Sequence, residues 1–138
     1  MVKHETRIRV QYYETDAMGI VHHSNYIRYF ETARTEFFRS RGYSYDRMEK
    51  SGVYMPVLTV SAEYKAAILY DEEISVICWI EKLKGASLSL GYEVRNAHTG
   101  ELHAKGTSSH GFTDLKLKPV RLKRVAPEIY GVLKAAAE

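Results

Sequence analysis

The chain has 138 residues, of which 45% are hydrophobic and 27% charged, with a formal net charge of +3. This composition fits one folded unit and excludes a chain that is disordered for lack of core-forming residues. The one cysteine, Cys78, excludes an internal disulfide, and the absence of a long apolar run or apolar leader predicts a cytoplasmic protein without a membrane anchor.

The predicted elements begin with a strand, because apolar and polar residues alternate over residues 8–12. An amphipathic helix is predicted over residues 24–41, where apolar residues recur at helical spacing. Ser24 is a suitable N-cap for this helix, and Gly42 suits the position after its C-terminus. A shorter helix is predicted over residues 45–51.

Four further runs alternate apolar and polar residues, which is the pattern of strands with one buried face. They cover residues 58–64, 74–80, 88–94 and 102–112. The short loops between neighbouring runs favour antiparallel pairing, and a terminal helix is predicted with Pro127 at its first position. No repeat or linker divides the chain. The sequence therefore predicts a single α+β domain over residues 1–138, with a five-stranded antiparallel sheet against one long helix.

Residues 12–26 (YYETDAMGIVHHSNY) carry a recognisable motif. Its elements are Asp16 after the first strand, Gly19, the apolar pair 20–21, and the pair 25–26 that opens the helix. The motif resembles the signature of the 4-hydroxybenzoyl-CoA thioesterase-like branch of the hotdog-fold superfamily. Because a histidine stands at His23, it most resembles the YbgC-like acyl-CoA thioesterases associated with the Tol–Pal system.

The segments FETARTEFF and EYKAAILYDEEISV also resemble this family, so the resemblance covers residues 5–125. Two departures are Ala67, where relatives often have proline, and Glu72, where they often have a second aspartate. The resemblance implies a hotdog fold, with a five-stranded antiparallel sheet wrapped around a long central helix. It implies hydrolysis of acyl-CoA to a free carboxylic acid and CoA, in a homo-oligomer that is a dimer or a tetramer.

The same resemblance implies that Asp16 is the catalytic carboxylate, as nucleophile or general base, with the helix N-terminus as the oxyanion donor. Both roles agree with the chemistry of thioester hydrolysis, which needs an activating carboxylate and donors aimed at the developing oxyanion. Backbone amides near His23 and Ser24 would be those donors. The alternative for Asp16 is a turn residue, since Asp at i and Gly at i+3 suit a type I turn. His23 either assists catalysis with its imidazole or supplies mainly its amide.

Candidate residues for substrate binding lie in three regions. Tyr26 is expected in the core at the border of the substrate site. A basic residue in a hairpin loop, Lys84, and the basic run at residues 116–124 match regions that hold the nucleotide in relatives. Within that run the candidates are Lys116, Lys118 and Arg121. The alternative for the run is a solvated surface of the chain's tail.

Other classes of function have less support in the sequence. The pair His22–His23 lacks a third ligand at metal spacing, so no metal is expected, and thioester hydrolysis needs no other cofactor. No RNA-binding motif is present, which argues against nucleic acid. An acyl carrier protein (ACP) in place of CoA, or a non-catalytic module that binds acyl thioesters, remain alternatives. Arg34 and Glu31, three residues apart, are expected to form a surface or interface ion pair.

Overall fold

The computed structural model describes residues 1–138 and shows one five-stranded sheet in the order β1-β3-β4-β5-β2. Every neighbouring pair of strands is antiparallel, as predicted. The strands are β1 (Lys3–Arg9), β2 (Val57–Tyr64), β3 (Glu73–Leu83), β4 (Ser87–Asn96) and β5 (Leu102–Gly111). Because β1 and β2 each have one partner, they form the two edges of the sheet.

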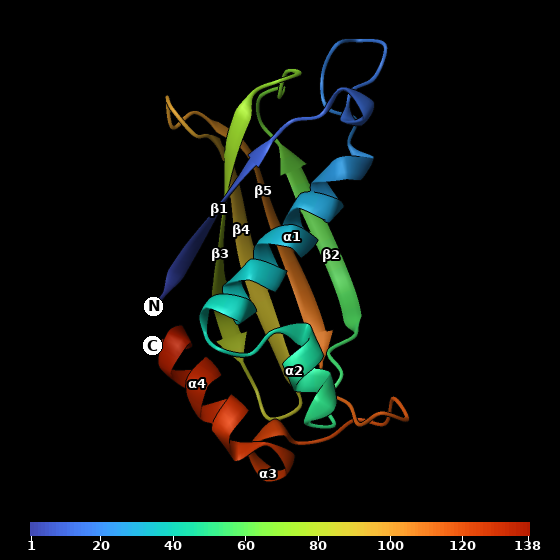
Figure 1. Ribbon diagram of the computed structural model, residues 1–138, viewed down its shortest axis with the longest axis vertical. Helices are drawn as coiled ribbons and strands as arrows, with labels where there is room; N and C mark the ends of the chain where they lie inside the picture. Colours follow the sequence, from blue (N-terminus) through green and yellow to red (C-terminus); the bar gives the residue numbers. More distant parts are fainter.

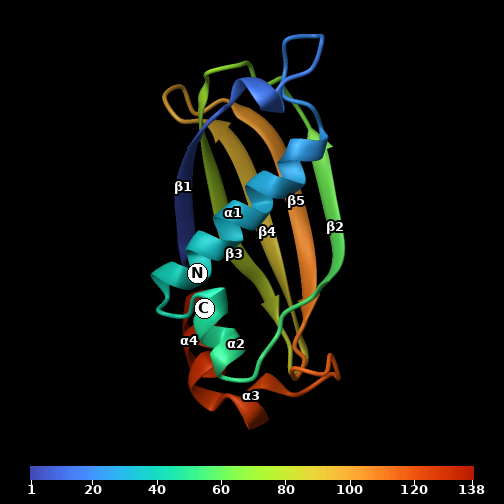
Figure 2. The ribbon, with the colours of Figure 1, turned by 45° about the vertical axis from the view of Figure 1, so that its right-hand side comes forward.

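The helix α1 (Ser24–Ser40) lies across one face of the sheet (Figures 1 and 2). The other helical segments are the 3₁₀ turn η1 (Tyr12–Glu14), α2 (Tyr45–Lys50), α3 (Leu122–Val125) and α4 (Pro127–Ala137). Figure 1 shows α3 and α4 beside one end of the sheet, with the two chain termini close together. None of these helices combines the length and the hydropathy needed to cross a membrane.

The core lies between α1 and the facing side of β3, β4 and β5. The predicted alternation is confirmed in β3 and β4, where every second residue is buried. The aromatic stripe of α1 packs on this surface, and the ring of Phe30 stacks on Tyr92 with centroids 4.4 Å apart. Gly106 on β5 leaves the space that the Phe30 ring occupies.

Two strand predictions need correction. Tyr12 does not extend the first strand but lies in η1, where it is 77% exposed. The run at 58–64 does form β2, but its large apolar residues Leu58, Val60 and Tyr64 are exposed, and only Ala62 is half-buried. The physical reason is that β2 lies at the edge of the sheet, where α1 covers its side chains less than those of the central strands, so alternation there produces no fully buried face in the isolated chain.

Two predictions about α1 also need correction. The N-cap is His23, without a side-chain cap bond, and Ser24 is the first helical residue. The predicted ion pair between Arg34 and Glu31 is present at 3.7 Å, but Arg34 is buried instead of lying at the surface, and its Nε donates to the Tyr45 hydroxyl at 2.8 Å. Gly42 follows the helix with a φ of +88°, as the sequence predicted.

Candidate active site

A narrow hairpin over residues 15–21 presents Asp16. Its backbone amide donates to the Ile20 carbonyl at 2.9 Å, and its carbonyl accepts from the Gly19 amide at 2.9 Å. Gly19 has a φ of +78°, a conformation that glycine adopts without strain. The Asp16 Oδ1 atom accepts from the Met18 amide at 2.9 Å, whereas no intramolecular hydrogen bond reaches Oδ2. Asp16 is therefore a turn residue that also keeps one carboxylate oxygen available.

The N-terminus of α1 offers a free amide at His23. The His22 amide donates to the Glu14 carbonyl at 2.8 Å, and the Ser24 amide donates to Nδ1 of His22 at 3.2 Å. No intramolecular hydrogen bond engages the His23 amide. The His22 and His23 rings stack with centroids 4.2 Å apart. Of the two amides expected as oxyanion donors, only that of His23 is free, because the Ser24 amide already bonds to His22.

Asp16, His23 and Tyr26 line one pocket with a volume of about 300 Å³. Its remaining walls are mostly apolar and come from the 15–21 hairpin, β2 and the segment that follows β2. Burial raises the pKa of Tyr26 to about 12, so its hydroxyl stays protonated at neutral pH. Ser24 is exposed and does not line the pocket. Sequence reasoning missed Tyr64 and Lys65 as wall residues, although the motif EYKAAILYDEEISV marked their segment.

The predicted CoA-binding residues Lys84, Lys116, Lys118 and Arg121, here called the basic cluster, are all exposed. Lys84 lines a second pocket of about 430 Å³. The Arg121 guanidinium lies over Gly85, where any side chain would collide with it. The amides of Lys116 and Lys118 donate to Oδ1 of Asp114 at 2.8 and 3.0 Å.

The basic cluster and the Asp16 pocket lie at opposite ends of the chain's fold. The β3–β4 hairpin and α3 lie at the end of the sheet away from the 15–21 hairpin (Figure 1). One chain therefore does not bring the basic cluster and Asp16 into one site.

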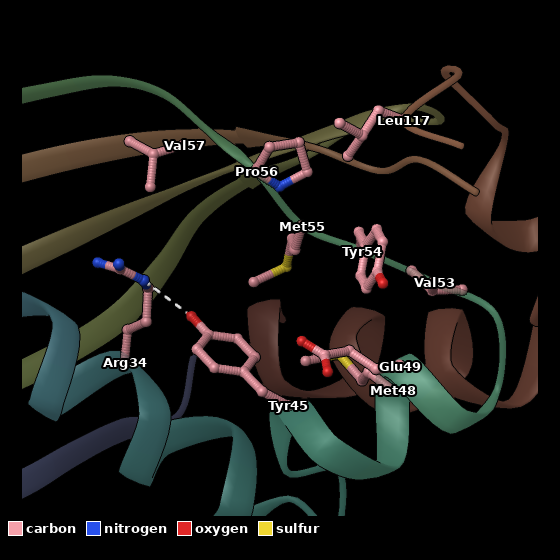
Figure 3. A pocket seen from close by; sticks show the side chains of 10 residues that line it. All are labelled: Arg34, Tyr45, Met48, Glu49, Val53, Tyr54, Met55, Pro56, Val57 and Leu117. Atoms are coloured by element: carbon pink, nitrogen blue, oxygen red, sulfur yellow. Dashed lines mark hydrogen bonds between the residues drawn. The ribbon is translucent and has the colours of Figure 1, made fainter. Parts of the chain in front are cut away.

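A third pocket, of about 300 Å³, lies between α2 and the segment before β2 (Figure 3). Arg34 and Tyr45 line it, and burial raises the pKa of Tyr45 to about 12. Behind Arg34, the Tyr92 hydroxyl and Nε2 of His110 each lie 2.7 Å from the Ser108 hydroxyl. Burial lowers the pKa of His110 to about 4, with the nearby Arg34 charge adding to this effect, so this imidazole is neutral at pH 7.

The thiol of Cys78 takes no part in any of these pockets. It is fully buried, and burial raises its pKa to about 12. A thiol that stays protonated at neutral pH is a poor nucleophile, so Cys78 is not a candidate for the reacting group.

Comparison with known proteins identifies the family of the chain. Residues 10–135 match the thioesterase-like superfamily. The chain is 40% identical to YneP of Bacillus subtilis, provisionally named an acyl-CoA thioesterase, over 88% of each chain. It is 30% identical to the acyl-CoA thioesterase YbgC of Haemophilus influenzae, over 92% of this chain and 93% of that protein.

Among solved structures, the DHNA-CoA thioesterase of Staphylococcus aureus superposes with a TM-score of 0.89 at 36% identity. The match covers 98% of this chain and 93% of that one. The fold and these relatives define a hotdog thioesterase. The chain belongs to the thioesterase-like superfamily and, within it, to the YbgC-like proteins, as its motif predicted.

Proposed function

We propose that this protein hydrolyses acyl-CoA to a free carboxylic acid and CoA, with Asp16 and the N-terminus of α1 as the reacting site. The observation that carries the proposal is the placement of Asp16 and His23 on one pocket. In this pocket an unpaired carboxylate oxygen of Asp16 and the free backbone amide of His23 lie on the same wall system. These are the two groups that thioester hydrolysis requires.

Two reaction routes use the same groups. In one, Oδ2 of Asp16 attacks the thioester carbonyl carbon and CoA leaves as the thiolate. Water then hydrolyses the resulting mixed anhydride and regenerates the carboxylate. In the other, Asp16 accepts a proton from water as the hydroxide attacks, and the tetrahedral intermediate collapses with loss of the thiolate. In both, the His23 amide donates to the carbonyl oxygen as negative charge develops on it.

The free edge of β2 supports a homodimer. Its apolar residues are exposed in the isolated chain, with Val57 at 51%, Leu58 at 62% and Tyr64 at 55%. An unpaired apolar edge is a template for pairing with a second strand. If two copies of β2 pair antiparallel, the Tyr64 end of one strand meets the Val57 end of the other. This places the Asp16 pocket of one subunit beside the basic cluster of the partner subunit.

We propose that the basic cluster binds the phosphates of CoA across this boundary. Phosphate binding by Lys and Arg is largely electrostatic and suits an exposed, mobile nucleotide. Because the cluster is exposed, it also suits an acidic carrier protein, and this observation keeps acyl-ACP as the second candidate substrate. Pairing of dimers into a tetramer would use the remaining surface of the sheet.

Residues 1–138 form one domain in which the sheet wraps around α1 as the central helix. The protein acts in the cytoplasm, needs no metal or redox cofactor, and binds no nucleic acid. A carboxylate and an oriented amide supply the chemistry of both routes, so no further group is required.

The test is release of free thiol from acetyl-, hexanoyl-, palmitoyl-, benzoyl- and 4-hydroxybenzoyl-CoA, and from the matching acyl-ACP. Asp16→Asn keeps the side-chain shape and the bond from the Met18 amide, and it should lower kcat by about 10²-fold or more. Asp46→Asn is the control, because Asp46 is an exposed carboxylate on α2. Absence of turnover on every ester would contradict the proposed hydrolysis and favour a non-catalytic module that binds acyl thioesters. Full turnover by Asp16→Asn would remove Asp16 from the mechanism.

A further inference from the structure

The segment over residues 65–72, which joins β2 to β3, forms one wall of the Asp16 pocket. Lys65 and Ala66 line that pocket. Further along the segment, the Ile68 carbonyl accepts from the Val21 amide at 2.8 Å, and Leu69 pairs with Ile20. The 65–72 segment is thus hydrogen-bonded to the hairpin that carries Asp16. A shift of this segment would therefore move both the pocket wall at Lys65 and Ala66 and the hairpin itself.

Two buried side chains outside the pocket hold this segment. Nδ1 of His103, on β5, lies 3.1 Å from the Ala66 carbonyl, and its Nε2 bonds to Oε2 of Glu72. The other oxygen of Glu72 accepts from the Leu69 amide at 3.2 Å, and Oε2 also accepts from Asn96 at 3.0 Å. The side chain of His103 is 2% exposed and that of Glu72 13%. His103 therefore fixes the start of the segment and Glu72 its end.

The two hydrogen bonds of His103 require one proton more than a neutral imidazole and an ionised carboxylate hold together. A carbonyl oxygen only accepts, so Nδ1 of His103 must carry a hydrogen. An ionised carboxylate also only accepts, and a neutral imidazole has only one N–H. Both hydrogen bonds therefore exist together only when a proton lies between Nε2 and Oε2, as an imidazolium beside a carboxylate or as an imidazole beside a carboxylic acid.

We propose that His103 and Glu72 are positioning residues for the thioesterase site, and that the proton they share keeps the 65–72 segment in its working position. Neither side chain of the pair lines the pocket, and His103 reaches it only through the Ala66 carbonyl. Loss of this proton removes one of the two hydrogen bonds of His103, and the wall loosens. The activity part of this inference rests on the proposed function, whereas the shared proton does not.

Other titratable groups lie around the pair without bonding to His103. The phenol of Tyr26 lies near Glu72 from α1 and stays protonated well above neutral pH, and Tyr64 on β2 packs against Tyr26. Along the chain the pair is flanked by Lys65 at the start of the segment and by the carboxylates of residues 71 and 73 at its end. The carboxylate of Glu73 instead bonds to Arg7 and Arg9.

The first test observes the proton directly. At pH 7, nitrogen NMR of His103 in the wild-type protein should show hydrogen on both ring nitrogens if the shared proton lies on the imidazole. If the proton lies on the carboxylate instead, nitrogen NMR should show hydrogen on Nδ1 alone, and carbon NMR should show a protonated Glu72 carboxyl. As pH rises, the amide of Leu69 should lose hydrogen-exchange protection in step with loss of this proton. An imidazole with one bare nitrogen beside an ionised Glu72 at pH 7 would overturn the inference.

The second test compares pH profiles of kcat/KM. The wild type should lose about tenfold on its alkaline limb, mainly through KM, because the wall contacts substrate and not the reacting carboxylate. Glu72→Gln has the same shape, and its amide N–H can donate to a bare Nε2, so both hydrogen bonds of His103 persist without the additional proton and the alkaline limb should disappear. Glu72→Asp restores the charge and should return the limb toward the wild-type position.

Glu101→Gln is the matched control, because Glu101 is exposed and its side chain makes no hydrogen bond, although it lies two residues from His103. The alkaline limb of its kcat/KM profile should coincide with that of the wild type. A purely structural pair predicts instead that Glu72→Gln lowers stability while leaving the limb unmoved, and this outcome would overturn the inference. No turnover by the wild type at any pH would refute the proposed function alone, since the NMR test needs no substrate.

Discussion

The rings of Tyr26 and Tyr64 meet edge to face, with centroids 4.8 Å apart. Tyr26 lies in the first turn of α1, and Tyr64 is the last residue of β2. The contact joins the end of the helix that carries the candidate oxyanion donor to the edge strand of the sheet. The pocket and the proposed dimer edge are therefore neighbouring parts of one structure.

Substitution of Val60 by lysine should weaken the dimer. Val60 is 39% exposed at the middle of β2, so pairing of two β2 strands would bury both copies. Buried lysines without partners raise the dissociation constant, here by about 10²-fold or more. Analytical ultracentrifugation measures this, and activity should fall with the dimer fraction. Val125→Lys, at an exposed valine on α3, is the control. An unchanged dimer of Val60→Lys would place the interface elsewhere.

Removal of charge from the basic cluster should impair binding of CoA esters selectively. In the double variant Lys84→Ala, Arg121→Ala, KM for acyl-CoA should rise by about 10-fold, and the rise should shrink at high salt. KM for the matching acyl-pantetheine, which lacks the nucleotide, should stay unchanged. Steady-state kinetics on both esters measures the difference, with Lys50→Ala as a control. An equal rise in KM for both esters would contradict phosphate binding by the cluster.

Substitution of Gly106 by alanine should destabilise the fold. A Cβ at this position would lie 2.3 Å from the Phe30 ring and 2.8 Å from the Ser61 carbonyl. Both neighbours are fixed, so overpacking should cost about 1–3 kcal/mol in the free energy of unfolding, measured by urea titration. Gly131→Ala, in α4, meets nothing within 4 Å and should stabilise by about 0.5–1 kcal/mol. Equal effects of the two changes would show that the Phe30 contact is unimportant.

His110 should make stability fall in acid. Burial lowers its pKa to about 4 in the folded protein, whereas an unfolded histidine titrates near pH 6.5. The unfolded state therefore binds the proton first. The stability that this group contributes is complete above about pH 6.5 and is lost as pH falls toward 4, by about 3 kcal/mol in all.

Urea unfolding at pH 7 and at pH 4.5 measures this effect. In His110→Gln the difference between the two pH values should be smaller than in the wild type by most of that amount, because glutamine does not titrate. His98→Gln removes an exposed histidine and should retain the wild-type difference. If His110→Gln shows the same difference as the wild type, the acid sensitivity arises at other groups.

Much of the fold could be predicted because its elements obey local rules. The buried faces of β3 and β4 show the period of two, and α1 shows helical spacing with Gly42 after its end. The YYETDAMGIVHHSNY motif placed Asp16 and His23 together, because both lie within one short segment that must turn between a strand and a helix. Local sequence is sufficient there, since few residues separate the two groups.

Contacts between distant segments could not be predicted in this way. The sequence by itself determined the order of the elements, the family motif and the candidate carboxylate. The tertiary structure decided that β2 is an exposed edge, that Arg34 is buried, and that the basic cluster lies away from Asp16. It also decided that His103 meets Glu72, 31 residues away along the chain. The reason is physical: periodicity records which side of an element is apolar, whereas strand order and packing between elements determine what covers that side.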